Sequence, residues 1–110
     1  MKDSNMRRFE VFEESMLPGL QPGDVLVARR SDHPKPGSIV VFPHPGHDGN
    51  WLVKRLVAAS GGEAWVESDN HEATMADSRT LGWIPTRSMH RAWLRYRRPA
   101  SVRLLVATIP

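Results

Sequence analysis

Proline and glycine recur along this chain at short intervals, and that spacing constrains the fold more than any other feature. Nine prolines and eight glycines occur in 110 residues, and no window of about a dozen residues carries a helical apolar stripe free of both. The short runs between them alternate in a way typical of strands. We therefore expect a mostly β fold, a single compact antiparallel β domain over residues 1–110. The expected strands are 8–12, 24–29, 38–42, 51–59, 63–67, 89–96 and 101–107, with short helical turns only, near 15–20 and 85–90.

The composition excludes several classes of protein. The chain has no cysteine, which removes disulfides, thiolate nucleophiles and cysteine-based zinc sites and fits a reducing compartment. A net charge of +3 is too small to indicate nucleic-acid binding by itself. No apolar stretch approaches the roughly 20 residues that cross a bilayer, and the N-terminus does not resemble a secretory signal. We expect a soluble cytoplasmic protein, with peripheral membrane association as the alternative.

The first informative segment follows the expected strand 8–12. There the chain turns at Ser15, and Pro18 and Gly19 prevent a long helix or strand. A serine on such a turn can present its hydroxyl in a cleft, close to backbone N–H groups that could stabilise an oxyanion. A serine that merely caps a helix or turn would look the same.

The second segment is the expected strand 51–59. Alternation places Lys54 on the same face as Leu52, Leu56 and Ala58. Burial of an ammonium group without a partner is costly, and it lowers the pKa of a lysine toward the neutral amine. A neutral amine can accept a proton from a serine hydroxyl. The alternative is a lysine that reaches water from an edge strand.

The third segment, residues 69–79, is polar and rich in turn-forming residues. Asp77 and Arg79 could pair with each other and fix a loop near the site. A solvated surface loop would have the same composition.

Taken in order, these segments resemble the conserved blocks of the type I signal peptidase family. The family has a Ser-Met-x-Pro block, then Gly-Asp-x-Val, then a Gly-Asp-x-Val-x-Phe strand and a Lys-Arg strand, and last an Asp-Asn…Ser-x-Asp-Ser-Arg block. The matching stretches here begin at Ser15, Gly23, Gly37, Lys54 and Asp69. The tail, from Gly82-Trp83-Ile84-Pro85 on, resembles a short soluble branch of nickel-type superoxide dismutase maturation proteases.

The resemblance implies a fold of the signal peptidase and LexA catalytic-domain type and a serine endopeptidase with a Ser/Lys dyad. Ser15 matches the nucleophile and Lys54 the general base, with Asp77, Ser78 and Arg79 in support. The implied partner is a protein precursor bearing an N-terminal pro- or signal peptide, such as that of nickel superoxide dismutase, bound as an added strand. No metal or other cofactor is implied. The residues expected to border the substrate groove are Met16, Ile39, Val40, Val41 and Phe42.

Two departures from the family pattern affect the site. Glu13 stands where the family often has a hydroxyl residue that completes the oxyanion hole. The last block is one residue longer than usual, so the hydroxyl that orients the lysine aligns with Thr74 or, counted from the other side, with Met75. We favour Thr74 because it keeps the hydroxyl.

Other readings of the chain are weaker. His44 and His47 have no evident third metal ligand, and no Gly-x-Ser-x-Gly motif supports a Ser-His-Asp triad. The basic and aromatic segment 87–98 could contact nucleic acid or an anionic membrane, but a solvated strand face explains it equally well. The rival functions are a membrane-associated signal peptidase that lacks its anchor, an inactive peptide-binding module of the same fold, and a self-cleaving regulator of the LexA type.

Overall fold

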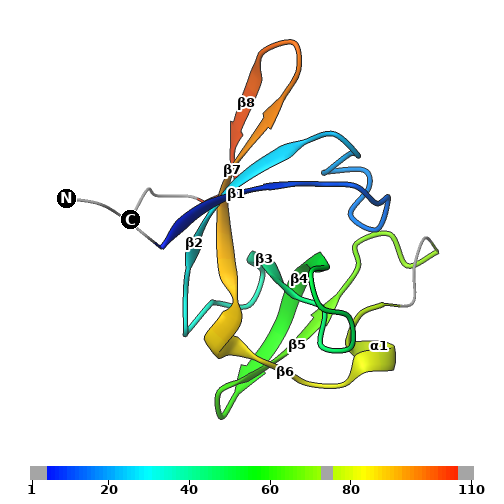
Figure 1. Ribbon diagram of the computed structural model, residues 1–110, viewed down its shortest axis with the longest axis vertical. Helices are drawn as coiled ribbons and strands as arrows, with labels where there is room; N and C mark the ends of the chain where they lie inside the picture. The colour runs from blue at the N-terminus through cyan, green and yellow to red at the C-terminus, as the bar shows by residue number, and fades with distance from the viewer. Residues whose placement is uncertain (1–4, 73–75, 107–110) are drawn as a thin grey trace.

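Eight strands form one antiparallel sheet in the computed structural model, which describes residues 5–72 and 76–106 (Figure 1). The order across the sheet is β1-β2-β7-β3-β4-β5-β6, and β8 pairs with β7. The strands are β1 (Met6–Glu10), β2 (Val25–Arg30), β3 (Ile39–Pro43), β4 (Trp51–Ser60), β5 (Glu63–Glu67), β6 (Ile84–Pro85), β7 (His90–Arg97) and β8 (Ser101–Leu104). The helical elements are a single turn, α1 (Ser78–Leu81), and a 3₁₀ turn, η1 (Thr86–Ser88).

All seven strands expected from the sequence are present, with ends shifted by a few residues. The helical turn expected near 85–90 is η1, and residues 15–20 form turns. Two short elements were not expected. The helical turn α1 begins at Ser78, at the end of the segment 69–79 that we expected to be a loop. Strand β6 is defined by its pairing with Glu63 and Ala64 of β5. A two-residue strand has no periodicity of its own to reveal it.

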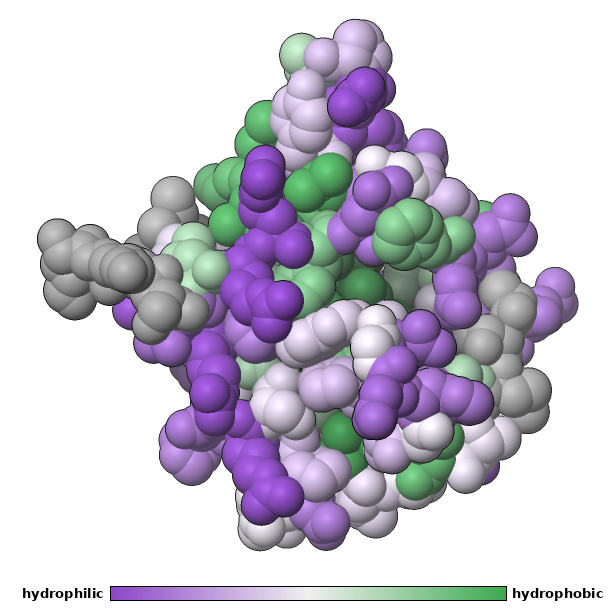
Figure 2. All heavy atoms as spheres, viewed as in Figure 1, coloured by the Kyte–Doolittle hydropathy of each residue, from purple (hydrophilic) through white to green (hydrophobic). Residues whose placement is uncertain are grey.

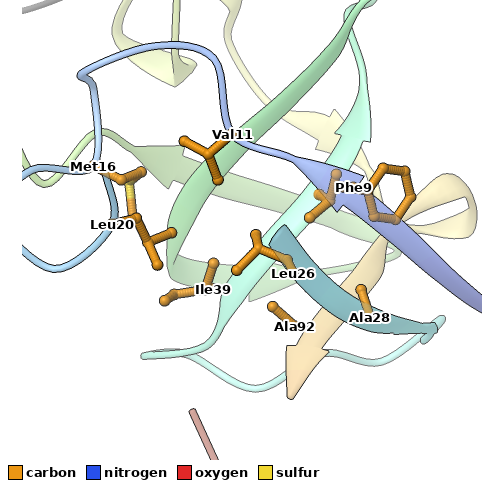
Figure 3. Close-up of a cluster of buried hydrophobic side chains, with 9 residues drawn as sticks. Phe9, Val11, Met16, Leu20, Leu26, Ala28, Ile39 and Ala92 are labelled. Carbon is orange, nitrogen blue, oxygen red and sulfur yellow. The ribbon is translucent and has the colours of Figure 1, made fainter. Parts of the chain in front are cut away.

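The core has two parts because the central strand β3 is buried on both faces. Ile39 and Val41 belong to one cluster of buried apolar residues, and Val40 and Phe42 to the other. Figure 3 shows the first cluster, in which Met16 and Leu20 reach in from the turns after β1. Since Met16 is 1% exposed, the chain next to Ser15 is anchored in the core.

Gly23 and Asp24 attach the segment 11–24 to the sheet through hydrogen bonds. Gly23 has a φ of 95°, a conformation that strongly favours glycine, and its N–H donates to the Val11 carbonyl. Asp24 is buried, and Arg97 of β7 donates to both of its carboxylate oxygens, at 2.8 and 2.9 Å. Burial alone would raise the pKa of Asp24, but the Arg97 pair and the Gln21 N–H hold this pKa below its usual value.

The β7–β8 hairpin projects from the rest of the sheet (Figure 1). Its register places Tyr96 beside Val102 and Leu94 beside Leu104, and hydrophobic surface is visible near its base (Figure 2). Strict alternation along β7 would place Ala92 and Arg95 on opposite faces. A register shift interrupts it, so that Ala92 and Arg95 are both buried. In the described part of the chain, no helix is long and apolar enough to cross a membrane.

Candidate active site

Ser15 lies in the turns between β1 and β2 and is 4% exposed. Its carbonyl accepts a hydrogen bond from the Asn70 N–H at 2.8 Å, and the Asn70 side-chain amide donates to the Glu14 carbonyl at 3.1 Å. The loop after β5 therefore lies against the Ser15 segment, as Figure 1 shows at one side of the molecule. With Met16 in the core on one side and Asn70 on the other, Ser15 is held in a fixed position.

Lys54 lies in β4 and is fully buried, with an exposure of 0%. It shares a buried face with Leu52 and Leu56, as the alternation predicted. Burial lowers the pKa of Lys54; the charges of Glu13 and Asp77 oppose that shift, and Arg79 adds to it. The balance favours the neutral amine more than in a solvent-exposed lysine, which is the form that can act as a base.

The Lys54 amine donates a hydrogen bond to a hydroxyl group on the neighbouring segment. Its Nζ donates to Ser68 Oγ at 3.1 Å, and both groups are buried. Ser68 comes two residues before Asn70, whose N–H holds Ser15. The segment 68–70 is thus in contact with both the candidate base and the backbone of the candidate nucleophile.

A β-bulge in β4 sets the register that brings Lys54 to Ser68. Leu56 pairs with Val66 whereas Ala58 pairs with Trp65, so Val57 is the extra residue, and it is 47% exposed. Without the bulge, Ser68 would face Arg55 instead, since the hairpin pairs Ser60 with Glu63. The bulge also moves Ala58 off the face of Lys54, which corrects the sequence-based expectation that they share one.

Asp77, Ser78 and Arg79 connect α1 to the end of β5. Asp77 is fully buried; its carboxylate accepts from the Ser68 N–H at 2.9 Å and pairs with Arg79 at 3.0 Å. Ser78 Oγ accepts from the Val66 N–H at 2.8 Å. Burial alone would raise the pKa of Asp77, but the Arg79 pair and the Ser68 N–H outweigh it and hold this pKa below its usual value. These contacts fix the backbone of Ser68, whose side-chain hydroxyl accepts the hydrogen bond from Lys54.

The two residues considered for orienting the lysine, Thr74 and Met75, lie outside the described residues. Sequence reasoning missed Ser68, because its position depends on the bulge. The sequence contains only a weak indication of Ser68. It is a small hydroxyl residue directly after β5, the strand that the Gly61-Gly62 turn connects to the strand of Lys54.

A groove of about 710 Å³ runs along β1 and reaches Ser15. One wall comes from β1 and the residues after it, up to Glu13, and the other from β3, β4 and the turn between them. Lys54 does not line the groove, whereas its neighbour Val53 does. Among the residues expected to border the groove, only Val41 lines it; Met16, Ile39, Val40 and Phe42 are buried in the two core clusters.

No group of three or more metal-ligating His, Cys, Asp or Glu side chains is found within the described ranges. The rings of His44 and His47 lie 4.5 Å apart in the turn between β3 and β4. His44 Nδ1 already accepts a hydrogen bond from the Gly46 N–H at 2.9 Å.

Two comparisons with known proteins show which family this chain resembles. The chain is 33% identical over 69 residues to signal peptidase I of Buchnera aphidicola subsp. Baizongia pistaciae, a match that covers 48% of this chain and 22% of the relative. The chain therefore spans about a fifth of that relative's length. The model of the Peptidase S24-like family matches residues 2–82, a range that holds Ser15, Lys54, Ser68 and Asp77. Since that match covers most of the chain and the whole candidate site, this protein belongs to the Peptidase S24-like family.

Proposed function

We propose that this protein is a serine endopeptidase in which Ser15 is the nucleophile and Lys54 the general base, and that it removes an N-terminal pro- or signal peptide from a protein precursor. The observation that carries the proposal is the burial of Lys54, the lowered pKa of its amine and its hydroxyl partner Ser68. A solvent-exposed lysine would be protonated near neutral pH and could not accept a proton. Burial without catalytic use would only cost stability.

The chemistry follows from these two groups. Neutral Lys54 Nζ takes the proton of Ser15 Oγ as that oxygen attacks the scissile carbonyl carbon. The C–N bond breaks, the leaving amine takes the proton from Lys54, and an acyl ester remains on Ser15. Water then attacks the ester while Lys54 accepts a proton from it, and this proton returns to Ser15 as the acid product leaves. The reaction consumes one water molecule and regenerates Ser15 and neutral Lys54.

Glu13 lies close to this chemistry. It lines the groove with Ser15, and its charge raises the pKa of Lys54 against the effect of burial. A carboxylate cannot donate to an oxyanion unless it is protonated, so in this proposal the backbone N–H of Ser15 is the principal donor. A carboxylate at the position where the family often has a hydroxyl donor would weaken the oxyanion hole. Glu13 therefore favours the second candidate function, an inactive peptide-binding module of the same fold.

The substrate proposal comes from the resemblance of the tail from Gly82 on to maturation proteases, and from the groove. An extended peptide fits along the free edge of β1, which pairs with β2 alone among the described strands. The proposed substrate is the precursor of nickel superoxide dismutase, and the alternative is a signal peptide cleaved at a membrane.

We expect the purified protein to shorten the nickel superoxide dismutase precursor at one bond near its N-terminus, detected by mass spectrometry. Ser15→Ala should leave the precursor intact, because no alkoxide can form. A precursor with a secretory signal peptide, presented in detergent, serves as the parallel substrate. Absence of cleavage of both precursors would count against the protease and favour the binding module, whereas equal cleavage by Ser15→Ala would show that Ser15 is not the nucleophile.

Ser68→Ala should slow acylation of Ser15 by a serine-directed acylating reagent about 10- to 100-fold, because the lysine loses the group that orients it. Loss of the Ser68 oxygen removes an acceptor that stabilises the ammonium form of Lys54, so the pKa of Lys54 should fall further. The acid limb of the pH–rate profile should therefore move to lower pH. Ser68→Thr keeps the hydroxyl and should recover most of the rate. A Ser68→Ala protein with the wild-type rate and pH profile would show that Ser68 has no positioning role.

A further inference from the structure

The end of the groove far from Ser15 carries a feature that the proposed chemistry does not use. Arg7, Phe9 and Trp51 line this part of the groove. Arg7 and Phe9 share a face of β1, and Trp51 begins β4 on the opposite wall. A bound strand rises about 3.3 Å per residue. A substrate side chain roughly five to eight residues from the scissile bond therefore reaches Arg7 when the peptide lies along β1.

The guanidinium of Arg7 lies over both aromatic rings. Its central carbon lies 5.2 Å from the centre of the Phe9 ring and 4.9 Å from that of Trp51, and the two rings are 4.9 Å apart. The His90 ring packs edge-on against both, at 5.3 and 5.8 Å. Stacking of this kind orders an arginine and leaves the N–H groups at its edge free to donate. Much of the entropy cost of fixing the side chain is therefore met before any ligand binds.

No carboxylate neutralises this arginine within the described part of the chain: the ion pairs found there involve Arg30, Arg55, Arg79, Arg97 and His71. Burial lowers the pKa of His90, and the charges of Arg7 and Arg30 lower it further, so the neutral ring adds no competing cation. Arg8 lines the same part of the groove, and the acidic lining residues Glu10 and Glu13 lie closer along the chain to Ser15. Arg8 and Glu10 both alternate with Arg7 and Phe9, so both point to the other face of β1.

We propose that Arg7, stacked on Phe9 and Trp51, forms a distal subsite that selects peptides with an acidic side chain about five to eight residues from the scissile bond. This inference rests on the proposed function for the position of the peptide, but not on catalysis. A planar guanidinium with free edge N–H groups matches a carboxylate in a bidentate geometry, which a lysine cannot reproduce. The rival explanation is that Arg7 only covers the two rings from solvent.

The test measures binding, so turnover is not needed. Fluorescent alanine-rich peptides that span the groove, each with a single Glu at one position, are titrated against the Ser15→Ala protein beside matched peptides with Gln. Within one narrow window of positions, Glu should bind about three- to tenfold tighter than Gln, and added salt should reduce the difference. Arg7→Gln should abolish the preference, Arg7→Lys should keep part of it, and Arg7→Glu should favour a Lys peptide over a Gln peptide.

Arg103→Gln is the matched control, because Arg103 is exposed on β8 and does not line the groove; it should leave the preference unchanged. Absence of peptide binding, equal binding of Glu and Gln peptides at every position, or a preference that survives Arg7→Gln would overturn the subsite. Cleavage by the wild-type protein is measured separately. If the Glu preference depends on Arg7 but the wild-type protein does not cleave, the subsite is supported and the protease proposal fails. If the wild-type protein cleaves but shows no Glu preference, the protease proposal is supported and the subsite fails.

Discussion

Lys54→Met is expected to abolish peptide cleavage and at the same time to stabilise the fold. The rate constant kcat/KM should fall at least about a thousandfold, because Lys54 is the base that takes the Ser15 proton in the proposed mechanism. Methionine has a similar length and no charge, so it should fill the space between Leu52 and Leu56 on the buried face of β4. The free energy of unfolding should rise by about 1 kcal/mol or more at neutral pH.

The sign of the stability change follows from the lowered pKa of Lys54. The unfolded chain holds a proton on this lysine below pH 10.5, whereas the folded chain holds it less tightly, so the wild-type fold loses stability as pH falls through that range. The advantage of Lys54→Met should therefore be present at neutral pH and vanish above pH 10.5. Urea unfolding monitored by tryptophan fluorescence at several pH values measures it.

Lys35→Met is the matched control, because Lys35 is exposed; it should change neither cleavage nor stability measurably. Two results would contradict the account of Lys54. Retention of cleavage by Lys54→Met would show that another group is the base. A large loss of stability would show that the lysine is charged and paired in the folded protein.

Asp77→Ala should be the most destabilising single change among the supporting residues, lowering the free energy of unfolding by about 2 to 3 kcal/mol. The change leaves the Ser68 N–H without its acceptor, removes the cap of α1 and removes the Asp77 side of the ion pair with Arg79. We expect the rate of Ser15 acylation to fall as well, because the backbone of Ser68 is then no longer fixed. Chemical unfolding together with labelling kinetics measures both effects.

The pH dependence separates this role of Asp77 from general loss of packing. The pKa of Asp77 is lowered in the fold, so its contribution is complete above its usual pKa of 3.8 and is lost as pH falls below that value. The stability difference between the wild type and Asp77→Ala should therefore shrink in acid. Asp32→Ala is the control, because the Arg30–Asp32 pair is exposed on both sides, and it should cost less than about 1 kcal/mol. A comparable loss in both variants would refute the special role of Asp77.

The sequence predicted much of the strand pattern because each strand carries its own signal. The runs around Val25, Val40 and Lys54 alternate and are bracketed by Gly and Pro, which local reasoning can detect. It also identified Lys54 as a lysine in an apolar row, and the fold confirms its burial. The joint catalytic role of Ser15 and Lys54 stays a prediction.

Ser68 and the groove walls could not be predicted, for physical reasons. Ser68 meets Lys54 because a single bulged residue, Val57, shifts the pairing of β4 and β5 by one position. No local propensity fixes where such a bulge falls. Likewise, Val40, Val41 and Phe42 are all apolar, so the sequence does not distinguish the residue that lines the groove from those that fill the core. In the fold, Val40 and Phe42 lie in the second core cluster and Val41 lines the groove.

The most direct test of the central claim, that Lys54 activates Ser15, is the pH dependence of covalent labelling by a serine-directed acylating reagent, with the modified residue identified by mass spectrometry. We predict an adduct on Ser15 whose rate of formation rises with pH through a pKa below 10.5. Lys54→Met should form it at least about a thousandfold more slowly. Labelling of Ser15 at the same rate in Lys54→Met, or modification of a different residue in the wild-type protein, would contradict the account.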